Sequence, residues 1–305
     1  LAITNPLSKW FPAGAASSVT LQGQMGGSQF DNLSWTNART GQSGTLTGAS
    51  TWEIPGIALQ PGSNDITISA RIFGTPASDS ATNSAYADGW QVGDNGGGGF
   101  EPWAQYSTYV PLITISSSSV LGTKAWQFEK PPSTDNYYYE AERALLSDLV
   151  PGDTLRFTLD RSAQGLGLYL SIGITAENGS WLGSLQFSPY TSNQVSIMGT
   201  DYTTLDLPAS TAGYEYRIEM LSATSSVVTI TSRSSSQNVQ ATIQWMGDGQ
   251  PANRISFFCM NYNWLPGPEY IQMGELQVIP GAQGQWQRDT VRILCSAFQD
   301  QDTDG

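Results

Sequence analysis

The chemistry open to this chain rests on carboxylates, because its 305 residues contain no histidine. Without histidine, neither a Ser-His-Asp nor a Cys-His triad can form, and the commonest nitrogen ligand of zinc is absent. Cleavage of a glycosidic bond needs two carboxyl groups about 5.5 Å apart, or farther apart when water lies between them. Strand residues two apart share one face near this spacing, and Glu140 with Glu142 fits it. Glu215 and Glu219, which flank Arg217, form a second candidate pair.

Both pairs also fit non-catalytic explanations. Glu140-Ala-Glu-Arg143 could begin a short helix. Glu215 and Glu219 fit the solvent face of a strand. The core face of that strand would hold Tyr214, Tyr216, Ile218 and Met220. The sequence therefore leads us to assign no catalytic residue.

The elements that carry these side chains are expected to be strands. Only 13% of residues are charged, and polar uncharged residues fill much of the remainder, which favours short strands and turns over amphipathic helices. A chain of this length exceeds the usual size of one domain, so two cores are expected. The net charge of −13 without a basic cluster argues against nucleic acid as a partner. No apolar run is long enough for a membrane span.

Residues 1–80 have the pattern of a small β-sandwich. Ile66, Ile68 and Ala70 alternate with polar residues, as in a half-buried strand, and Pro61-Gly62 predicts the turn before it. The unit resembles the bacterial immunoglobulin-like modules of surface proteins and secreted glycosidases. The resemblance is carried by Val19-x-Leu-x-Gly23, Trp35-x-Asn37, Thr40-Gly41, Ser43-Gly44, Trp52 and Leu59-x-Pro-Gly-x-Asn64-x-Ile-x-Ile-x-Ala70. It implies an immunoglobulin-like fold. Trp35 and Trp52 could stack on sugar rings, but each lies within an apolar strand pattern, which favours the core.

Residues 85–280 predict a larger antiparallel sandwich. About seven strands are expected at 154–159, 166–174, 181–187, 214–220, 239–246, 255–260 and 274–279. The strand at 166–174 has one unbroken apolar face and is expected to be central. Four glycines at 96–99 predict a tight crossing that marks the boundary with the first unit.

The second unit resembles the concanavalin-like, laminin-G-like jelly-roll domain of bacterial extracellular proteins. The resemblance is carried by Asp88-Gly-Trp90, Gly96-Gly-Gly-Gly-Phe100, Trp103, Ala125-Trp126 and Leu149-Val-Pro-Gly-Asp-Thr-Leu-Arg-Phe157. It implies an all-β protein, with an N-terminal immunoglobulin-like sandwich plus a larger jelly-roll sandwich. Glycosidases of this fold commonly carry a Glu-x-Asp-x-x-Glu strand, which this sequence lacks.

Relatives of the jelly-roll fold bind or cleave polysaccharides, so aromatic rings are the candidate sugar contacts. Trp90, Trp103, Trp126 and Trp181 fit strand cores better than an exposed site. One candidate group lies in the turn-rich segment 261–268, and the other is a tyrosine run from which alternation sends at least one ring outward. The candidate glycan-binding residues are Tyr262, Asn263 and Trp264, and Tyr137, Tyr138 and Tyr139.

Residues 281–305 are expected to form a tail. Asp300, Asp302 and Asp304 precede Gly305 at alternate positions and resemble the start of a thrombospondin type 3-like or EF-like calcium repeat. The natural polypeptide is then expected to continue into a calcium-rich stalk, and a frayed acidic terminus is the alternative. A second calcium site could combine Asp88, Asp94 and Asn95 with loop carbonyl groups. Calcium is the one cofactor considered.

The two cysteines, Cys259 and Cys295, fit either one disulfide in an oxidising compartment or two buried thiols.

The function that the sequence favours is non-catalytic adhesion or glycan binding by a secreted or surface-attached bacterial protein. Its partner would be a polysaccharide or a cell-surface glycan. The first alternative is a structural subunit that binds copies of itself in an extracellular filament or matrix. The second alternative is a polysaccharide hydrolase or lyase.

Overall fold

The computed structural model describes residues 1–6, 10–11, 18–25, 29–47, 50–106, 113–117, 119–129, 138–161, 168–187, 193–247, 249–261, 270–281 and 285–295. These residues form strands and turns, with one 3-10 helix, η1 (Ser84–Tyr86). The prediction of an all-β protein is confirmed. Within the described ranges, no helix is long and apolar enough to cross a membrane. Unit 1 combines residues 1–73 with the segment from 283, and unit 2 comprises residues 74–282.

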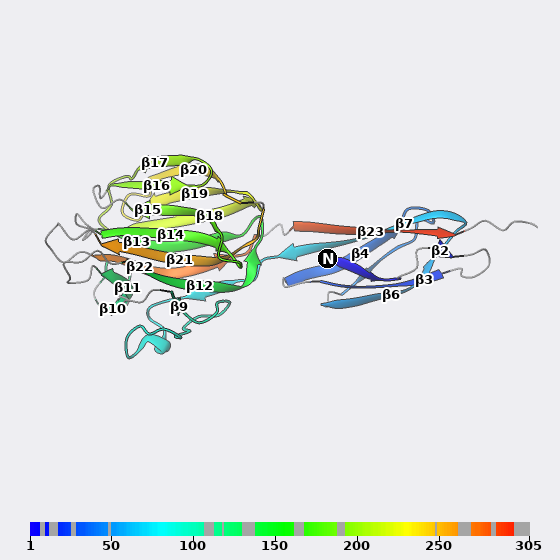
Figure 1. The fold of residues 1–305 in the computed structure, drawn as a ribbon, viewed down its shortest axis with the longest axis horizontal. Coiled ribbons are helices and arrows are strands. Elements are labelled where there is room, and N and C mark those ends of the chain that lie inside the picture. Colours follow the sequence, from blue (N-terminus) through cyan, green and yellow to red (C-terminus); the bar gives the residue numbers. More distant parts are fainter. Residues whose placement is uncertain are drawn as a thin grey trace, which may run out of the picture. The chain divides into compact units, whose positions relative to one another are not determined.

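Unit 1 consists of two sheets that share one core (Figure 1). One sheet has the order β1-β3-β6, and the other has the order β2-β23-β7-β4-β5. Ile66, Ile68 and Ala70 are fully buried, and Trp35 and Trp52 are also in the core, so the predicted inner face is confirmed. The strands are β1 (Ala2–Asn5), β2 (Trp10–Phe11), β3 (Ser18–Gln24), β4 (Gln29–Asn37), β5 (Ser43–Leu46), β6 (Thr51–Ala58), β7 (Gly62–Phe73) and β23 (Gln285–Cys295).

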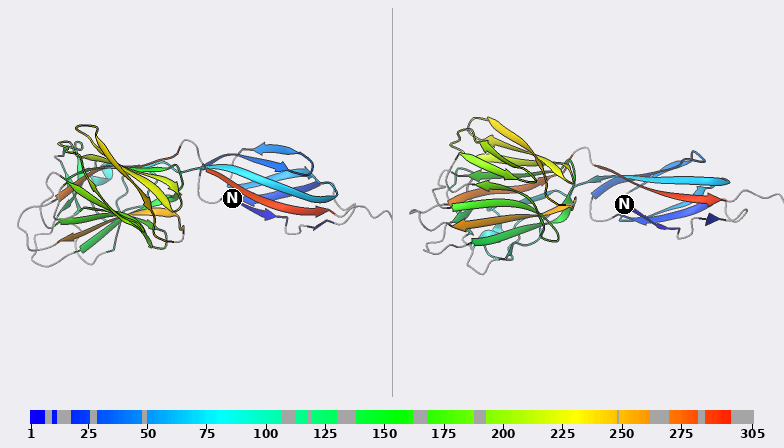
Figure 2. Two further views of the ribbon diagram at one scale, coloured as in Figure 1. Left: turned by 90° about the horizontal axis from the view of Figure 1, so that it is seen from above. Right: turned by 45° about the horizontal axis from the view of Figure 1, so that its top comes forward.

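The expected tail at 281–305 instead supplies a strand of unit 1. Strand β23 pairs antiparallel with β7 at all eleven of its residues, from Gln285 opposite Ile72 to Cys295 opposite Gly62. Both views of Figure 2 show the red strand β23 alongside the cyan strand β7. Val291 and Ile293 point into the core of unit 1. The prediction missed this strand because its partner precedes it by about two hundred residues, whereas sequence patterns report local structure.

Unit 2 is an antiparallel sandwich around a second core (Figure 1). One sheet has the order β10-β11-β22-β13-β18-β19-β20, with β8 also paired to β22. The other sheet has the order β17-β16-β15-β14-β21-β12-β9, so β14 is central, as the sequence predicts. The strands are β8 (Ala77–Asp79), β9 (Ala104–Gln105), β10 (Ile113–Ser116), β11 (Ala125–Glu129), β12 (Tyr138–Leu149), β13 (Thr154–Asp160), β14 (Leu168–Ala176), β15 (Trp181–Phe187), β16 (Gln194–Met198), β17 (Tyr202–Asp206), β18 (Tyr214–Ser222), β19 (Ser225–Ser232), β20 (Asn238–Gln244), β21 (Ala252–Asn261) and β22 (Tyr270–Ile279).

The glycine run 96–99 lies inside unit 2, whereas the sequence analysis placed the boundary between the units there. The boundary falls between Phe73 and Gly74. A Cβ atom at Gly97 would overlap the carbonyl oxygen of Ser78, so this close approach of two backbones requires glycine. The run therefore packs against β8 of the larger sandwich instead of separating two domains.

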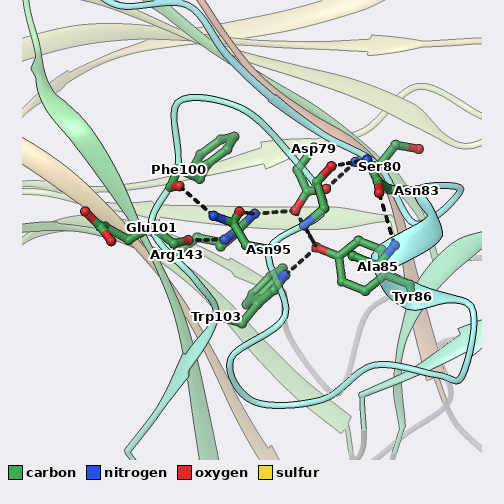
Figure 3. A network of polar contacts seen from close by, with 11 residues as sticks. Asp79, Ser80, Asn83, Ala85, Tyr86, Asn95, Phe100, Glu101, Trp103 and Arg143 are labelled. Atoms are coloured by element: carbon green, nitrogen blue, oxygen red, sulfur yellow. Dashed lines mark hydrogen bonds and ion pairs between the residues drawn. The ribbon is translucent and has the colours of Figure 1, made fainter.

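A buried ion pair fixes this glycine-rich segment to the sandwich (Figure 3). The Nη2 atom of Arg143, on β12, lies 2.5 Å from Oδ2 of Asp79, on β8, and both side chains are fully buried. Arg143 also donates to Oδ1 of Asn95 at 2.9 Å and to the carbonyl oxygen of Glu101. The Tyr86 hydroxyl donates to the same Asp79 oxygen at 2.5 Å. These contacts set the course of the chain that leads through β9 to Tyr106.

Replacing Arg143 with Met should destabilise unit 2 by about 3–5 kcal/mol, because Asp79 would remain buried without its cation. Urea unfolding of the whole chain measures the change. The matched control is Arg156→Met, since Arg156 pairs with Glu215 at 2.6 Å where both side chains are partly exposed. Such a pair contributes about 1 kcal/mol or less. Equal losses in the two variants would contradict the role given to Arg143.

Candidate functional site

A pocket of about 290 Å³ combines the acidic, basic and aromatic side chains that glycan chemistry requires. It opens on the face of the β17 to β9 sheet that is turned away from the core. Three carboxylates line it, from Glu140 and Glu142 on β12 and from Glu177 in the turn after β14. The lining also includes Arg254 on β21 and Trp181 on β15. The sequence analysis had identified the first two carboxylates as a candidate pair.

Alternation along β12 explains why Glu140 and Glu142 share this face. Tyr139, Ala141 and Arg143 point inward and are buried, so the glutamates between them point outward. The strand rise places their Cα atoms about 7 Å apart. Residues 138–149 form a strand, so the short helix considered for 140–143 is wrong.

The strand register gathers the remaining lining residues beside this pair. Glu142 lies opposite Ser256 on β21, and Ser256 lies opposite Gly173 on β14. In the next outward-facing row, Arg254 lies opposite Thr175, which in turn lies opposite Trp181 on β15. These residues are far apart in the sequence, and their proximity follows from the pairing of four neighbouring strands.

The Trp181 ring lies against the backbone of Gly173. A Cβ atom at Gly173 would overlap the six-membered ring of Trp181, so only glycine allows this position. The Trp181 side chain remains partly exposed at the pocket. Tyr106, which is 60% exposed, lines the same pocket from the β9 side. Two aromatic rings are therefore available to a ligand beside the carboxylates.

Glu142 is held by an ion pair at the base of the pocket. Its Oε1 atom lies 2.8 Å from Nη1 of Arg254 and accepts a hydrogen bond from the Tyr106 hydroxyl at 3.3 Å. The Glu142 side chain is 8% exposed, whereas that of Arg254 is 26% exposed. These contacts fix the orientation of the Glu142 side chain.

Glu140 has a different environment. Burial raises the pKa of Glu140 above its usual value, the negative charge of Glu142 raises it further, and the Ser256 hydroxyl acts in the opposite direction. The raised pKa makes Glu140 a candidate proton donor.

The pKa of Glu140, followed by carboxyl ¹³C NMR during a pH titration, should lie above the usual glutamate value. In a Glu142→Gln variant it should fall, because the neighbouring negative charge is gone while burial remains. The protonated form of Glu140 therefore persists to higher pH in the native protein. A titration at or below the usual value in the native protein would contradict this assignment.

The second candidate pair lies elsewhere. Glu215 and Glu219 are on β18, in the sheet opposite the pocket, and Tyr214 and Tyr216 on the same strand are buried. Glu215 accepts hydrogen bonds from Arg156 at 2.6 and 2.9 Å. The alternative interpretation as the solvent face of a strand is confirmed by the burial pattern of β18.

The predicted glycan-binding residues do not meet at the pocket. Tyr139 is 3% exposed and belongs to the core, so it cannot present its ring to a ligand. Trp90, Trp103 and Trp126 are also buried. The structure describes the backbone of Tyr138 within β12 but not its side chain. The other candidates, Tyr137, Tyr262, Asn263 and Trp264, lie outside the described residues.

The predicted calcium ligands are not tested by this structure. Asp300, Asp302 and Asp304 lie outside the described residues. Asp88 and Asp94 accept hydrogen bonds from Gln91 at 3.0 and 2.7 Å, and Asn95 accepts one from Arg143. The described part of the chain contains no cluster of three or more acidic, cysteine or histidine side chains placed to hold a metal ion. Both calcium sites stay predictions.

Of the two alternatives for the cysteines, the structure has free thiols and no disulfide between them. Cys259 is a free thiol in the core of unit 2, and Cys295 is a free thiol on β23 of unit 1. Burial raises the pKa of Cys259 to about 12, so this thiol stays protonated near neutral pH.

A second pocket in unit 1, of about 410 Å³, lacks a comparable set of groups. Its lining includes Gln22, Gln24 and a single carboxylate, Glu53. Trp52 also contributes, but it is 6% exposed and belongs to the core. The pocket that contains Glu140 and Glu142 is therefore a better candidate for catalysis than this one.

Comparison with known proteins finds similar solved structures but no match in sequence. No protein-family model matches it, and no curated protein is similar to it in sequence. A Bacillus licheniformis beta-glucanase is 15% identical, with a TM-score of 0.41, and the match covers 62% of this chain and 97% of that one. A family 16 glycoside hydrolase of Bacteroides ovatus, in complex with a G4G4G3G product, is 8% identical, with a TM-score of 0.43 and coverages of 58% and 94%. The lectin UEA-II, complexed with galactose, is 11% identical, with a TM-score of 0.36 and coverages of 59% and 98%.

These comparisons contradict the favoured function from the sequence analysis. Similar structures include several glucanases and glycoside hydrolases, whereas non-catalytic adhesion had been the leading prediction. The prediction that the protein is not an enzyme is contradicted by the same finding. The comparisons also give no support to a filament subunit or to binding of further copies of the chain.

Sequence reasoning missed the side chains that surround the carboxylate pair. Trp181 had been assigned to a strand core, and Arg254 and Tyr106 had not been singled out. One usable signal was present, because Gly173 interrupts the outward face of a strand and leaves space for a large ring. The ion pair between Arg254 and Glu142 had no local signal, since it depends on the register between β12 and β21.

Proposed function

We propose that unit 2 is a polysaccharide hydrolase whose active site is the pocket containing Glu140 and Glu142. The observation that carries the proposal is the pair itself, with two carboxyl groups on one strand face in different electrostatic environments. Hydrolysis of glycosides requires an acid and a second carboxylate on either side of the scissile bond. This chemistry needs neither histidine nor a metal ion.

Glu140 is the general acid in this proposal. Its raised pKa keeps a proton available for the leaving-group oxygen. Glu142 is the second carboxylate, which activates water or attacks the sugar directly. Arg254 orients Glu142 through the 2.8 Å ion pair, and Tyr106 donates to the same oxygen. Two glutamates whose Cα atoms are about 7 Å apart can hold their carboxyl groups at the retaining or at the inverting separation.

The aromatic lining supports a sugar ligand. Flat faces of Trp and Tyr pack well against the apolar faces of sugar rings, while neighbouring polar groups bind the hydroxyls. Trp181 and Tyr106 both present exposed surface at the pocket, and Asn178 adds an amide. A polysaccharide partner is therefore consistent with the lining.

The charges of the pocket favour a hydrolase over a lyase. A lyase acts on uronic acids and needs cations to bind their carboxylates. Among the described lining residues, Arg254 is the one cation, and Glu142 already pairs with it. The Glu177 carboxylate would repel an anionic sugar. We expect a neutral polysaccharide.

The test is incubation of the purified chain with a panel of soluble neutral glucans, xylans, mannans and galactans. New reducing ends should appear with at least one of them, and NMR of the first product should give the anomer formed. Absorbance at 232 nm monitors unsaturated products in parallel on polygalacturonate and alginate. Unsaturated products, or the absence of any cleavage, would overturn the proposal.

We further propose that unit 1 is an immunoglobulin-like module appended to this hydrolase in a secreted or surface-attached bacterial protein. Its separate two-sheet core supports the role of a module. Asp300, Asp302 and Asp304 would be ligands of a calcium ion, as their resemblance to calcium-binding loops implies.

A further inference from the structure

The floor of the pocket carries a buried hydroxyl group without a partner. Thr175, on β14, is 2% exposed, and its Oγ1 atom makes no hydrogen bond within the described part of the chain. A buried hydroxyl that is left unpaired costs free energy, so such groups usually have a bound partner. Thr175 lines the same pocket as the carboxylate pair.

The strand register places the Thr175 side chain on the face of the sheet that carries the pocket. Ile174 and Ala176 are buried in the core, so alternation directs Thr175 to the opposite face. Thr175 lies opposite Trp181 on one side and Arg254 on the other. Its side chain is therefore between the exposed aromatic ring and the cation that orients Glu142.

The Arg254 side chain, opposite Thr175 on β21, already has a partner within the protein. The Nη1 atom of Arg254 pairs with Glu142 at 2.8 Å. The Thr175 hydroxyl is thus a polar group in the pocket lining that forms no hydrogen bond with another described residue. Because a hydroxyl both donates and accepts, it matches a sugar hydroxyl better than it matches an ion.

We propose that Thr175 is a specificity-determining residue, whose Oγ1 atom binds one hydroxyl of the sugar ring that packs on Trp181. The inference rests on the proposed function for its ligand class, and it adds the group that selects among neutral sugars. A site built to bind a substrate hydroxyl discriminates against the analogue lacking it, because the protein group is then left unpaired. The selected sugar is the one whose hydroxyl reaches the floor while its ring lies on Trp181.

The experiment measures binding separately from cleavage. The full chain carries Glu140→Gln in every sample, so that the probes survive, and calorimetry records binding of cello-, laminari-, xylo- and mannotetraose. Thr175→Val removes the hydroxyl and keeps the shape, and Thr175→Ser restores the hydroxyl. Thr204→Val is the matched control, because Thr204 is exposed on the edge strand β17 of the same sheet. Thermal unfolding confirms that each variant folds.

For the tetraose that binds best, Thr175→Val should weaken binding about 3- to 10-fold, the factor expected for one neutral hydrogen bond. Thr175→Ser and Thr204→Val should stay within about 2-fold of the parent. Monodeoxy analogues of that sugar give the sharper result. One of these analogues should bind the parent protein more weakly than the full sugar by the same factor, about 3- to 10-fold. The same analogue and the full sugar should bind Thr175→Val equally well.

Unchanged binding in Thr175→Val, or equal losses at every deoxy position in both proteins, would overturn the inference. Absence of binding to all four probes would also overturn it. Failure of the proposed function looks different. If binding depends on Thr175 but the native chain cleaves no polysaccharide, the inference stands and hydrolysis is rejected. If the native chain cleaves a polysaccharide but Thr175→Val binds as the parent does, hydrolysis stands and the inference is rejected.

Discussion

Glu142→Gln should strongly reduce cleavage of both a polysaccharide and an activated aryl glycoside. The substitution removes the carboxylate that attacks or activates water, and it leaves Arg254 without its partner at 2.8 Å. Loss of a positioned acid or base typically lowers kcat by about 10²- to 10⁴-fold. Reducing-end release measures the first substrate, and release of dinitrophenolate measures the second.

Glu140→Gln should separate the two substrates. A sugar leaving group needs a proton from Glu140, whereas dinitrophenolate leaves without protonation. Cleavage of the polysaccharide should therefore fall by about 10²- to 10⁴-fold, while release of dinitrophenolate should fall far less. This contrast would assign the acid to Glu140 and the second role to Glu142.

The control for both variants is Glu215→Gln, a matched change on β18 in the opposite sheet. It should leave both activities within about 2-fold of the native chain, because Glu215 pairs with Arg156 away from the pocket. If Glu140→Gln and Glu142→Gln retain native activity on both substrates, the pocket is not the active site.

Removing residues 283–305 should unfold unit 1 and leave unit 2 folded. Strand β23 lies between β2 and β7 in its sheet, so its loss removes eleven paired positions on β7. It also removes Val291 and Ile293 from the core, each contributing about 1.5–3 kcal/mol on burial. With about 1 kcal/mol for each lost backbone hydrogen bond, the total approaches or exceeds the 5–15 kcal/mol that stabilises a typical domain.

Calorimetry and limited proteolysis measure this outcome. The truncated chain should lose one of two unfolding transitions, and protease should digest residues 1–73 while sparing 74–282. The control chain ends at Cys295, retains β23 and should show both transitions. Two native-like transitions in the chain lacking 283–305 would mean that unit 1 does not depend on β23.

Local patterns alone predicted much of the fold. The alternation of Tyr214, Tyr216, Ile218 and Met220 against polar residues fixes a strand with one buried face, and the structure confirms both. The apolar face of 166–174 likewise predicted the central position of β14. Such patterns work because side chains alternate across any half-buried strand, whichever partner it pairs with.

The sequence also determined the spacing of Glu140 and Glu142, since two residues on one strand share a face regardless of the rest of the molecule. Tertiary structure decided what surrounds them. Arg254 and Trp181 reach the pair only through the register of β12, β21, β14 and β15, and β23 joins unit 1 only through pairing with β7. Pairing between distant strands depends on the packing of whole sheets, which no local stretch of residues encodes.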